Sequence, residues 1–454
     1  MFNKYLSLCG LTMSLTLLLC GCGNSTSSGG VTVTEANQGL PIMGDTIKYD
    51  PNKLVNEGEP ISLDFYVWDD AIIKDIATAY EELFPNVNIN VVVNPWDDYW
   101  TKLPLELSSS KGPALFNVHN SYHDNIIDYM APYDIPLEDL QADFLAVDSH
   151  IIDGEVYYID YGIMTGAIYY NKKMWQAAGL TENDIPKTWQ EFQEIAEKLT
   201  IKEGDNLVQS GFNFNGDLAF LLLGLPYQLG QNIFDSSGRT VTIANDANIQ
   251  VAQMLVDLYT KYQVGSGDFG TSAEQSFGQE QSAMVYKWAH YNNNLKVNYP
   301  DVDYGVFEIP TFTEETPYAY DRYNGESTFG INKNADPKEQ EIAQDFIKFF
   351  LANDEVQKKL CLDISVFPTK FSLAEDSDIQ SHPLMGILKD TIDHYIWPGP
   401  MPATVENTLK QVSEDIIYNN VDIKSALEKA EETINADLEQ TQFKSTESLY
   451  KYAK

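Results

Sequence analysis

Residues 153–180 read DGEVYYIDYGIMTGAIYYNKKMWQAAGL. Within this stretch, residues 156–159 and 166–170 are rich in aromatic and β-branched side chains, which favour strands. The intervening residues 160–162 include Asp and Gly and predict a break in regular structure. The stretch therefore predicts two strands with a short crossing between them.

A similar alternation continues toward the N-terminus. Residues 63–68 and 88–93 have the character of strands, and residues 71–84 and 100–107 have that of helices. Alternating strands and helices favour an α/β fold with a mostly parallel sheet, flanked by helices, whose ligand crevice lies beyond the carboxyl ends of the strands. Further helices are predicted at residues 188–199, 248–262, 337–351 and 425–438.

The charge and cysteine content exclude several classes of protein. The chain of 454 residues has 67 acidic and 29 basic residues, so duplex nucleic acid and anionic lipid headgroups are poor partners. Cysteines stand at positions 9, 20, 22 and 361 only, which allows no disulfide framework. Cys361, between two leucines, is predicted to be a buried apolar residue.

The N-terminus has the features of a bacterial lipoprotein signal. Lys4 precedes the apolar run 6–19, and the sequence Leu-Cys-Gly-Cys ends at Cys22, which is followed by a segment rich in Ser, Gly and Thr. We expect residues 1–21 to be removed and Cys22 to be lipidated. Residues 22–58 would form a flexible tether. This places the protein on the extracellular face of the cytoplasmic membrane, attached through its N-terminal lipid only.

Several segments, taken in their order along the chain, resemble those of a known family. They include 153–180 and the sequences FPNVNI (84–89), PKTWQEF (186–192), YGVFEIP (304–310) and AQDFIKFF (343–350). In this order they resemble the extracellular solute-binding proteins of ABC importers, in particular the sugar- and oligosaccharide-binding family that includes maltodextrin-binding proteins. The sequence Gly-Pro-Ala at 112–114 departs from the Pro-Asp common in that family. The sugar preference of its better-known members therefore does not transfer.

The resemblance implies a two-lobed fold and a role in transport rather than catalysis. The protein would be a monomer without a cofactor that hands its ligand to ABC permease subunits, and binding would close a hinge between the lobes. The chain would cross between lobes near residues 162–166, 309–312 and 363–367. The N-terminal lobe would comprise 59–163 and 311–363, and the C-terminal lobe 166–309 and 367–454.

A sugar site needs flat aromatic platforms with hydrogen-bonding groups at their edges. Trp288 is the preferred platform, because the family places a stacking aromatic shortly after a sequence like Ala283-Met284. The other candidates lie near expected strand ends, at the hinge or on a rigid loop: Trp68, Asp69, Asp70, Trp96, His119, Asn120, Tyr161, Asn324, Glu326 and Trp397. For most of them a structural role remains open: Asp69 or Asp70 as a helix cap, His119 as a structural histidine, and Trp96, Tyr161 or Trp397 as packing residues.

Two other functions stay open on the sequence. A secreted glycoside hydrolase also uses carboxylates in an aromatic cleft, and its pair need not be adjacent in the chain. An oligopeptide- or polyamine-binding protein would use similar lobes, and the many acidic residues would attract a cation. The six dispersed histidines and the absence of a Cys/His cluster indicate no transition-metal site.

Overall fold

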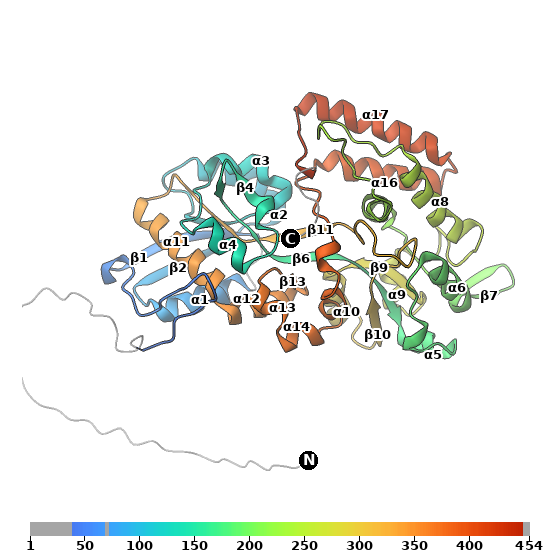
Figure 1. Cartoon of the computed structure of the whole chain (residues 1–454), viewed down its shortest axis with the longest axis horizontal. Coiled ribbons are helices and arrows are strands. Elements are labelled where there is room, and N and C mark those ends of the chain that lie inside the picture. Colours follow the sequence, from blue (N-terminus) through green and yellow to red (C-terminus); the bar gives the residue numbers. More distant parts are fainter. Residues whose placement is uncertain (1–38, 69–71, 448–454) are drawn as a thin grey trace, which may run out of the picture.

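The computed structural model describes residues 39–68 and 72–447. Three residues with predicted roles, Cys22, Asp69 and Asp70, lie outside this part of the chain. Two α/β bodies lie side by side, and the long strand β6 (Asp160–Asn171) runs from one into the other (Figure 1). Within the described residues, no helix is both long and apolar enough to cross a membrane.

The first lobe is built on a four-stranded sheet with the order β12-β3-β1-β2. Strand β1 (Ile61–Val67) pairs in parallel with β2 (Val87–Val93) and β3 (Leu115–Asn117), and β12 (Phe329–Ile331) pairs antiparallel with β3. Alternate β1 side chains are buried, as expected for a strand with one face on a core. The predicted strand–helix alternation is confirmed here. The helices of this lobe are α1 (Ile73–Leu83), α2 (Trp96–Leu107), α3 (His123–Ile126), α4 (Leu137–Asp143), α11 (Pro337–Ala352) and α12 (Asp354–Ile364).

Strand β6 is the centre of a second, antiparallel sheet. Its first half pairs with β11 (Tyr323–Ser327) and β13 (Phe367–Pro368), and its second half with β9 (Met284–Trp288) and β10 (Tyr304–Phe307). The break predicted at residues 160–162 is therefore wrong, because β11 and β13 supply backbone partners to these residues. The irregular residues are 157–159 instead. The expected parallel pairing likewise holds for β1, β2 and β3 but not for any partner of β6.

The second lobe surrounds the second half of β6 with helices. Helix α6 (Trp189–Leu199) begins at a capping box formed by Thr188 and Glu191 and buries its apolar face, as predicted. The predicted helices near 248–262 and 425–438 are found as α8 (Asp246–Thr260) and α17 (Ile423–Thr441). The other helices are α5 (Lys172–Ala177), α7 (Leu218–Gly224), α9 (Ala273–Gly278), α10 (His290–Asn298) and α16 (Ala403–Ile417).

Short elements complete the fold. The hairpins β4 (Ile151–Ile152) with β5 (Glu155–Val156), and β7 (Ile201–Glu203) with β8 (Asn206–Gln209), lie outside the two main sheets. Helices α13 (Phe371–Ala374), α14 (Ser377–Ser381) and α15 (Met385–Leu388) follow β13. Buried side chains of α14 and α15, including Ile379 and Met385, belong to the same core as α11. This part of the chain thus packs with the first lobe.

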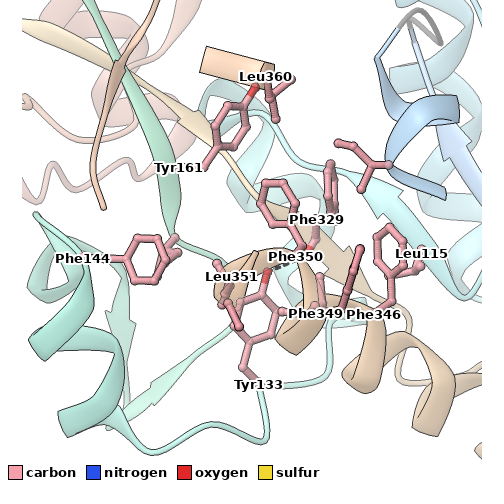
Figure 2. Packing of buried hydrophobic residues seen from close by; sticks show 14 of the residues in the cluster. Leu115, Tyr133, Phe144, Tyr161, Phe329, Phe346, Phe349, Phe350, Leu351 and Leu360 are labelled. Atoms are coloured by element: carbon pink, nitrogen blue, oxygen red, sulfur yellow. Dashed lines mark hydrogen bonds between the residues drawn. The ribbon is translucent and has the colours of Figure 1, made fainter. Parts of the chain in front are cut away.

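The core of the first lobe is rich in phenylalanine. Figure 2 shows Phe346, Phe349 and Phe350 of α11 gathered beside Leu115 and Phe329 of the sheet. The ring of Tyr161 packs edge-on against Phe350 in the same cluster, with ring centroids 5.9 Å apart (Figure 2). Cys361 is also fully buried in this cluster, which confirms its predicted role as an apolar residue.

Residues 39–58 lie against the first lobe, so the expectation of a flexible tether does not hold for them. Ile47 and Tyr49 are buried in its core. The Asp143 carboxylate accepts hydrogen bonds from the backbone N–H groups of Thr46 and Ile47, and Tyr49 donates to Asp345 at 2.7 Å. These partners replace water for the segment, which explains why a run without sequence periodicity is ordered.

Candidate functional site

The polar face of β11 lies beside a cavity between the two lobes. Because side chains on a strand alternate, Asn324 and Glu326 share one face of this strand, and Arg322 precedes the strand at the same spacing of two. Asn324 stands opposite Met164 of β6, and Trp288 of β9 stands opposite Gly166. Three strands thus present their side chains to the same region.

The cavity has a volume of about 400 Å³ and draws its walls from distant parts of the chain. His119, Asn120 and Tyr122 come from the first lobe, and Phe220 and Trp288 from the second. Loop 397–402 and the start of α16 close one side. Five predicted residues line it: His119, Asn120, Trp288, Asn324 and Trp397.

Trp288 is held at its edge and on its face. Its Nε1–H donates to the Tyr286 hydroxyl at 2.9 Å, and this hydroxyl donates to Asp321 at 2.8 Å. The Arg322 guanidinium lies 4.7 Å from the centre of the Trp288 ring, within the range of a cation–π interaction. The ring is therefore fixed while remaining partly exposed at the cavity, as a stacking platform requires.

The wall in the first lobe is a cluster of aromatic rings. Trp68 packs edge-on against Trp96 with centroids 5.1 Å apart, and Trp100 stacks on Tyr122 at 4.1 Å. Trp96 is 37% exposed whereas Trp100 is 7% exposed, so packing explains Trp100 and leaves Trp96 with a free surface. Neither Trp68 nor Trp96 lines the cavity itself. Both support His119, whose ring lies 5.1 Å from that of Trp96.

On the side formed by the first lobe, the cavity is lined by polar groups that carry no charge. Burial lowers the pKa of His119 to about 4, so its imidazole is neutral at physiological pH. Asn120 is 2% exposed and donates from Nδ2 to Asn324 Oδ1 at 3.0 Å. This bond joins the loop after β3 to the polar face of β11.

Comparison with known proteins identifies the family. The family model described as bacterial extracellular solute-binding protein matches residues 68–357, more than half of the chain. The protein belongs to this family. Its predicted resemblance to solute-binding proteins is thereby confirmed.

Relatives of this solute-binding protein include named sugar-binding proteins. The arabinooligosaccharide-binding protein of Halalkalibacterium halodurans is 23% identical, covering 81% of this chain and 87% of that protein. The maltotriose-binding protein of Pyrococcus abyssi is 22% identical, covering 80% of this chain and 78% of that protein. In each case the match extends over most of both chains.

Solved structures confirm the two-lobed α/β fold. The cyclic alpha-maltosyl-1,6-maltose binding protein from Arthrobacter globiformis superposes with a TM-score of 0.70 at 18% identity, over 84% of this chain and all of that one. UgpB from Mycobacterium tuberculosis, in complex with glycerophosphocholine, gives a TM-score of 0.68 at 17% identity, again over 84% and 100%. At these identities the likeness concerns the fold alone.

Trp397 occupies a different position in this solute-binding protein from that of Trp288. It is 3% exposed and stacks on His150, with ring centroids 5.0 Å apart. The same residue also borders a second cavity of about 510 Å³, which contains His123 and Tyr158. Trp397 therefore combines the two roles considered for it, because it packs against the first lobe and also borders both cavities.

Besides Trp68 and Trp96, two further predicted residues lie away from the cavity lining. Tyr161 is in the core of the first lobe, which agrees with the packing alternative considered for it. Glu326 shares the polar face of β11 but lies farther along the strand. Burial raises the pKa of Glu326 to about 7, and the nearby charge of Asp160 adds to the rise. Asp160 itself is buried with His150, 3.0 Å away.

Sequence analysis missed several residues of the cavity. Arg322 was overlooked although it precedes Asn324 and Glu326 at a spacing of two, which is the signal of a shared strand face. Phe220 lies in a leucine-rich run that predicts only core. Tyr122 and Glu406 carried no distinguishing pattern. Among the described residues, no group of three or more His, Cys, Asp or Glu side chains is arranged to hold a metal ion.

Proposed function

We propose that this protein captures an oligosaccharide in the cavity between its lobes and delivers it to an ABC permease. The single observation that carries the proposal is the pairing of two aromatic walls across one cavity, with Tyr122 on the first lobe and Trp288 on the second. Sugar rings expose C–H faces to such walls and hydroxyls to the groups at their edges. The names of the relatives, which specify arabino-oligosaccharides and maltotriose, support the same ligand class.

Binding would proceed by closure of the hinge. A ligand that contacts both walls gains interactions in the closed state that the open state lacks, so it shifts the population toward closure. We place the crossings between lobes near residues 162–166, 309–312 and 363–367. Support for the first comes from β6, whose partners change from β11 to β9 between Thr165 and Gly166.

The test combines calorimetry with small-angle X-ray scattering on the purified chain without its signal. We expect at least one neutral or acidic oligosaccharide to bind and to reduce the radius of gyration. Chromatography of the same mixtures checks for shorter products, whose appearance would favour a glycoside hydrolase instead. Binding of polyamines or oligopeptides without any response to saccharides would contradict the proposed ligand class.

We further propose that lipid on Cys22 holds the protein at the extracellular face of the cytoplasmic membrane. The Leu-Cys-Gly-Cys sequence and the preceding apolar run support this attachment. Replacing Cys22 by Ser is expected to release the protein from the membrane fraction and abolish labelling by a radioactive fatty acid. Cys361→Ser is the matched control and should leave both unchanged.

A further inference from the structure

Arg322 stands out among the basic residues of this chain. The sequence contains only two arginines, Arg239 and Arg322. Arg239 is exposed on a turn after Asp235, whereas Arg322 is 7% exposed and lines the cavity between the lobes. A buried guanidinium is costly unless its N–H groups are hydrogen-bonded, so its partners need to be identified.

Within the described part of the chain, Nε and Nη2 of Arg322 have no hydrogen-bond partner. The neighbouring Asp321 does not supply one, because its carboxylate accepts the backbone N–H of Arg322 at 2.7 Å and the Tyr286 hydroxyl at 2.8 Å. The rings of Trp288 and Phe220 lie 4.7 and 5.7 Å from the guanidinium carbon. They stabilise the cation through its face, while Nε and Nη2, which are buried from solvent, receive no partner from the described part of the chain.

The two unpartnered nitrogens lie on the same side of the guanidinium. Nε–H and one N–H of Nη2 point in parallel, which is the side-on geometry in which arginine binds both oxygens of a carboxylate. Lysine has no such fork. The position therefore holds one of only two groups in the chain that can recognise a planar anion in this way.

The residues of the lining itself do not neutralise Arg322, although the buried Asp321 behind it attracts the cation electrostatically. Among the described lining residues, Glu406 is the one acidic side chain, and Lys410 pairs with it at 2.7 Å. Asn324 Oδ1 is occupied by Asn120, which leaves the Asn324 amide nitrogen as a second donor. The lining thus has one positive charge and surplus donors. The large negative charge elsewhere on the chain acts weakly here, because salt screens exposed charges beyond about 8 Å.

We propose that the bound saccharide carries a carboxylate, as a hexuronic acid unit does, and that Arg322 binds this carboxylate through Nε and Nη2 while the sugar ring stacks on Trp288. This inference rests on the proposed function and specifies its substrate class. A carboxylate carries one negative charge, which matches the single cation of the lining. A phosphate monoester carries close to two charges at neutral pH and would lack a second partner.

The test is calorimetry with matched pairs of oligosaccharides of two to four units. Each pair compares a neutral sugar with its uronic acid: glucose with glucuronate, galactose with galacturonate, and mannose with mannuronate. We expect at least one uronate oligosaccharide to bind tenfold or more tightly than its neutral partner. The same sugar carrying a 6-phosphate should bind more weakly than the uronate, and tighter binding of the phosphate would contradict the assignment to a carboxylate.

Single substitutions test whether Arg322 is the source of the preference for the uronate. Arg322→Gln should reduce the preference for the uronate to about threefold or less, and Arg322→Lys should recover only part of it because lysine lacks the fork. Arg239→Gln is the matched control and should bind like the wild type. Thermal denaturation checks that each variant is folded, and the wild-type comparison stands without any variant.

The outcomes separate the two proposals. Binding of neutral oligosaccharides with an affinity equal to or greater than that of their uronates would overturn the carboxylate assignment while leaving the proposed function intact. A folded Arg322→Gln protein that keeps the full preference would also overturn it. Failure of every saccharide in both series would contradict the proposed function itself.

Discussion

At the scale of single residues, the geometry distinguishes the two tryptophans at the cavity. Trp288 is partly exposed and fixed by one hydrogen bond and one cation–π contact, whereas Trp397 is almost fully buried. A partly exposed ring that is already held in place loses little side-chain entropy when a ligand stacks on it. Trp288 is therefore suited to contribute mainly to binding, and Trp397 to stability.

Replacing Trp288 by Ala tests this assignment. We expect a tenfold to hundredfold loss of sugar affinity, about 1.4–2.7 kcal/mol, because the ring face is removed from the ligand. Unfolding should remain a single cooperative transition. Isothermal titration calorimetry measures the loss, with Trp175→Phe in helix α5 as the control, and an unchanged dissociation constant would remove Trp288 from the site.

Glu326 predicts a pH dependence of stability. Its pKa in the folded protein is raised to about 7, so the folded state favours the protonated carboxyl more than the unfolded state does. The resulting stabilisation is complete below the unfolded pKa of about 4.5 and is lost as pH rises through about 7. Glu326→Gln imitates the protonated form and should raise the melting temperature at pH 8.5 but not at pH 4.5.

Melting curves of the unliganded variant at both pH values check this expectation. Glu203→Gln, on the exposed strand β7, is the control for removal of one surface charge. A Glu326→Gln protein that gains no stability relative to this control at pH 8.5 would show that the carboxyl is not desolvated.

The sequence predicted part of the site. His119, Asn120, Asn324 and Trp397 could be found because polar and aromatic residues at expected strand ends and on rigid loops are visible in a linear pattern. Trp288 was predicted through the resemblance, because the family places a stacking aromatic shortly after a sequence like Ala283-Met284. The role of Tyr161 was left undecided, since a tyrosine beside Gly has the same sequence signature in a hinge as in a core. Tyr122 could not be identified, because its position depends on stacking against Trp100 from another element.

At the scale of elements, β6 shows where local patterns become insufficient. Asp160 and Gly162 favour a turn in isolation, yet both lie in a continuous strand because β11 and β13 pair with this segment from far along the chain. Tertiary pairing thus overrides local preference. Helix α6 shows the opposite case, since its capping residues and apolar spacing are all local and the helix was predicted closely.

The loop 397–402 is an element whose stability depends on one side chain. Trp397 fills a buried position against His150, so Trp397→Ala should lower the free energy of unfolding by about 3–5 kcal/mol. Urea denaturation measures this change, and Trp288→Ala should lose less because its ring is partly exposed. A loss below about 1 kcal/mol for Trp397→Ala would show that the loop is not anchored by this ring.

At the scale of the whole molecule, the order of segments along the chain was enough to predict two lobes. It was not enough to predict which short segments pack with which lobe. The resemblance predicted two discontinuous lobes from the order of family-like stretches along the chain. It could not predict that α14 and α15 pack with the core of α11, or that residues 39–58 lie against the first lobe. The placement of residues 39–58 depends on contacts such as that of Thr46 with Asp143, 97 residues apart in the chain. The placement of α14 and α15 depends on a few buried side chains in short helices.

The shared strand β6 also bears on how the protein melts. If either lobe unfolds, β6 loses backbone hydrogen-bond partners on that side, and this loss weakens the other lobe as well. Differential scanning calorimetry should therefore record one endotherm whose van't Hoff and calorimetric enthalpies agree, although the architecture suggests two units. Two resolved endotherms would mean that β6 does not couple the unfolding of the two lobes.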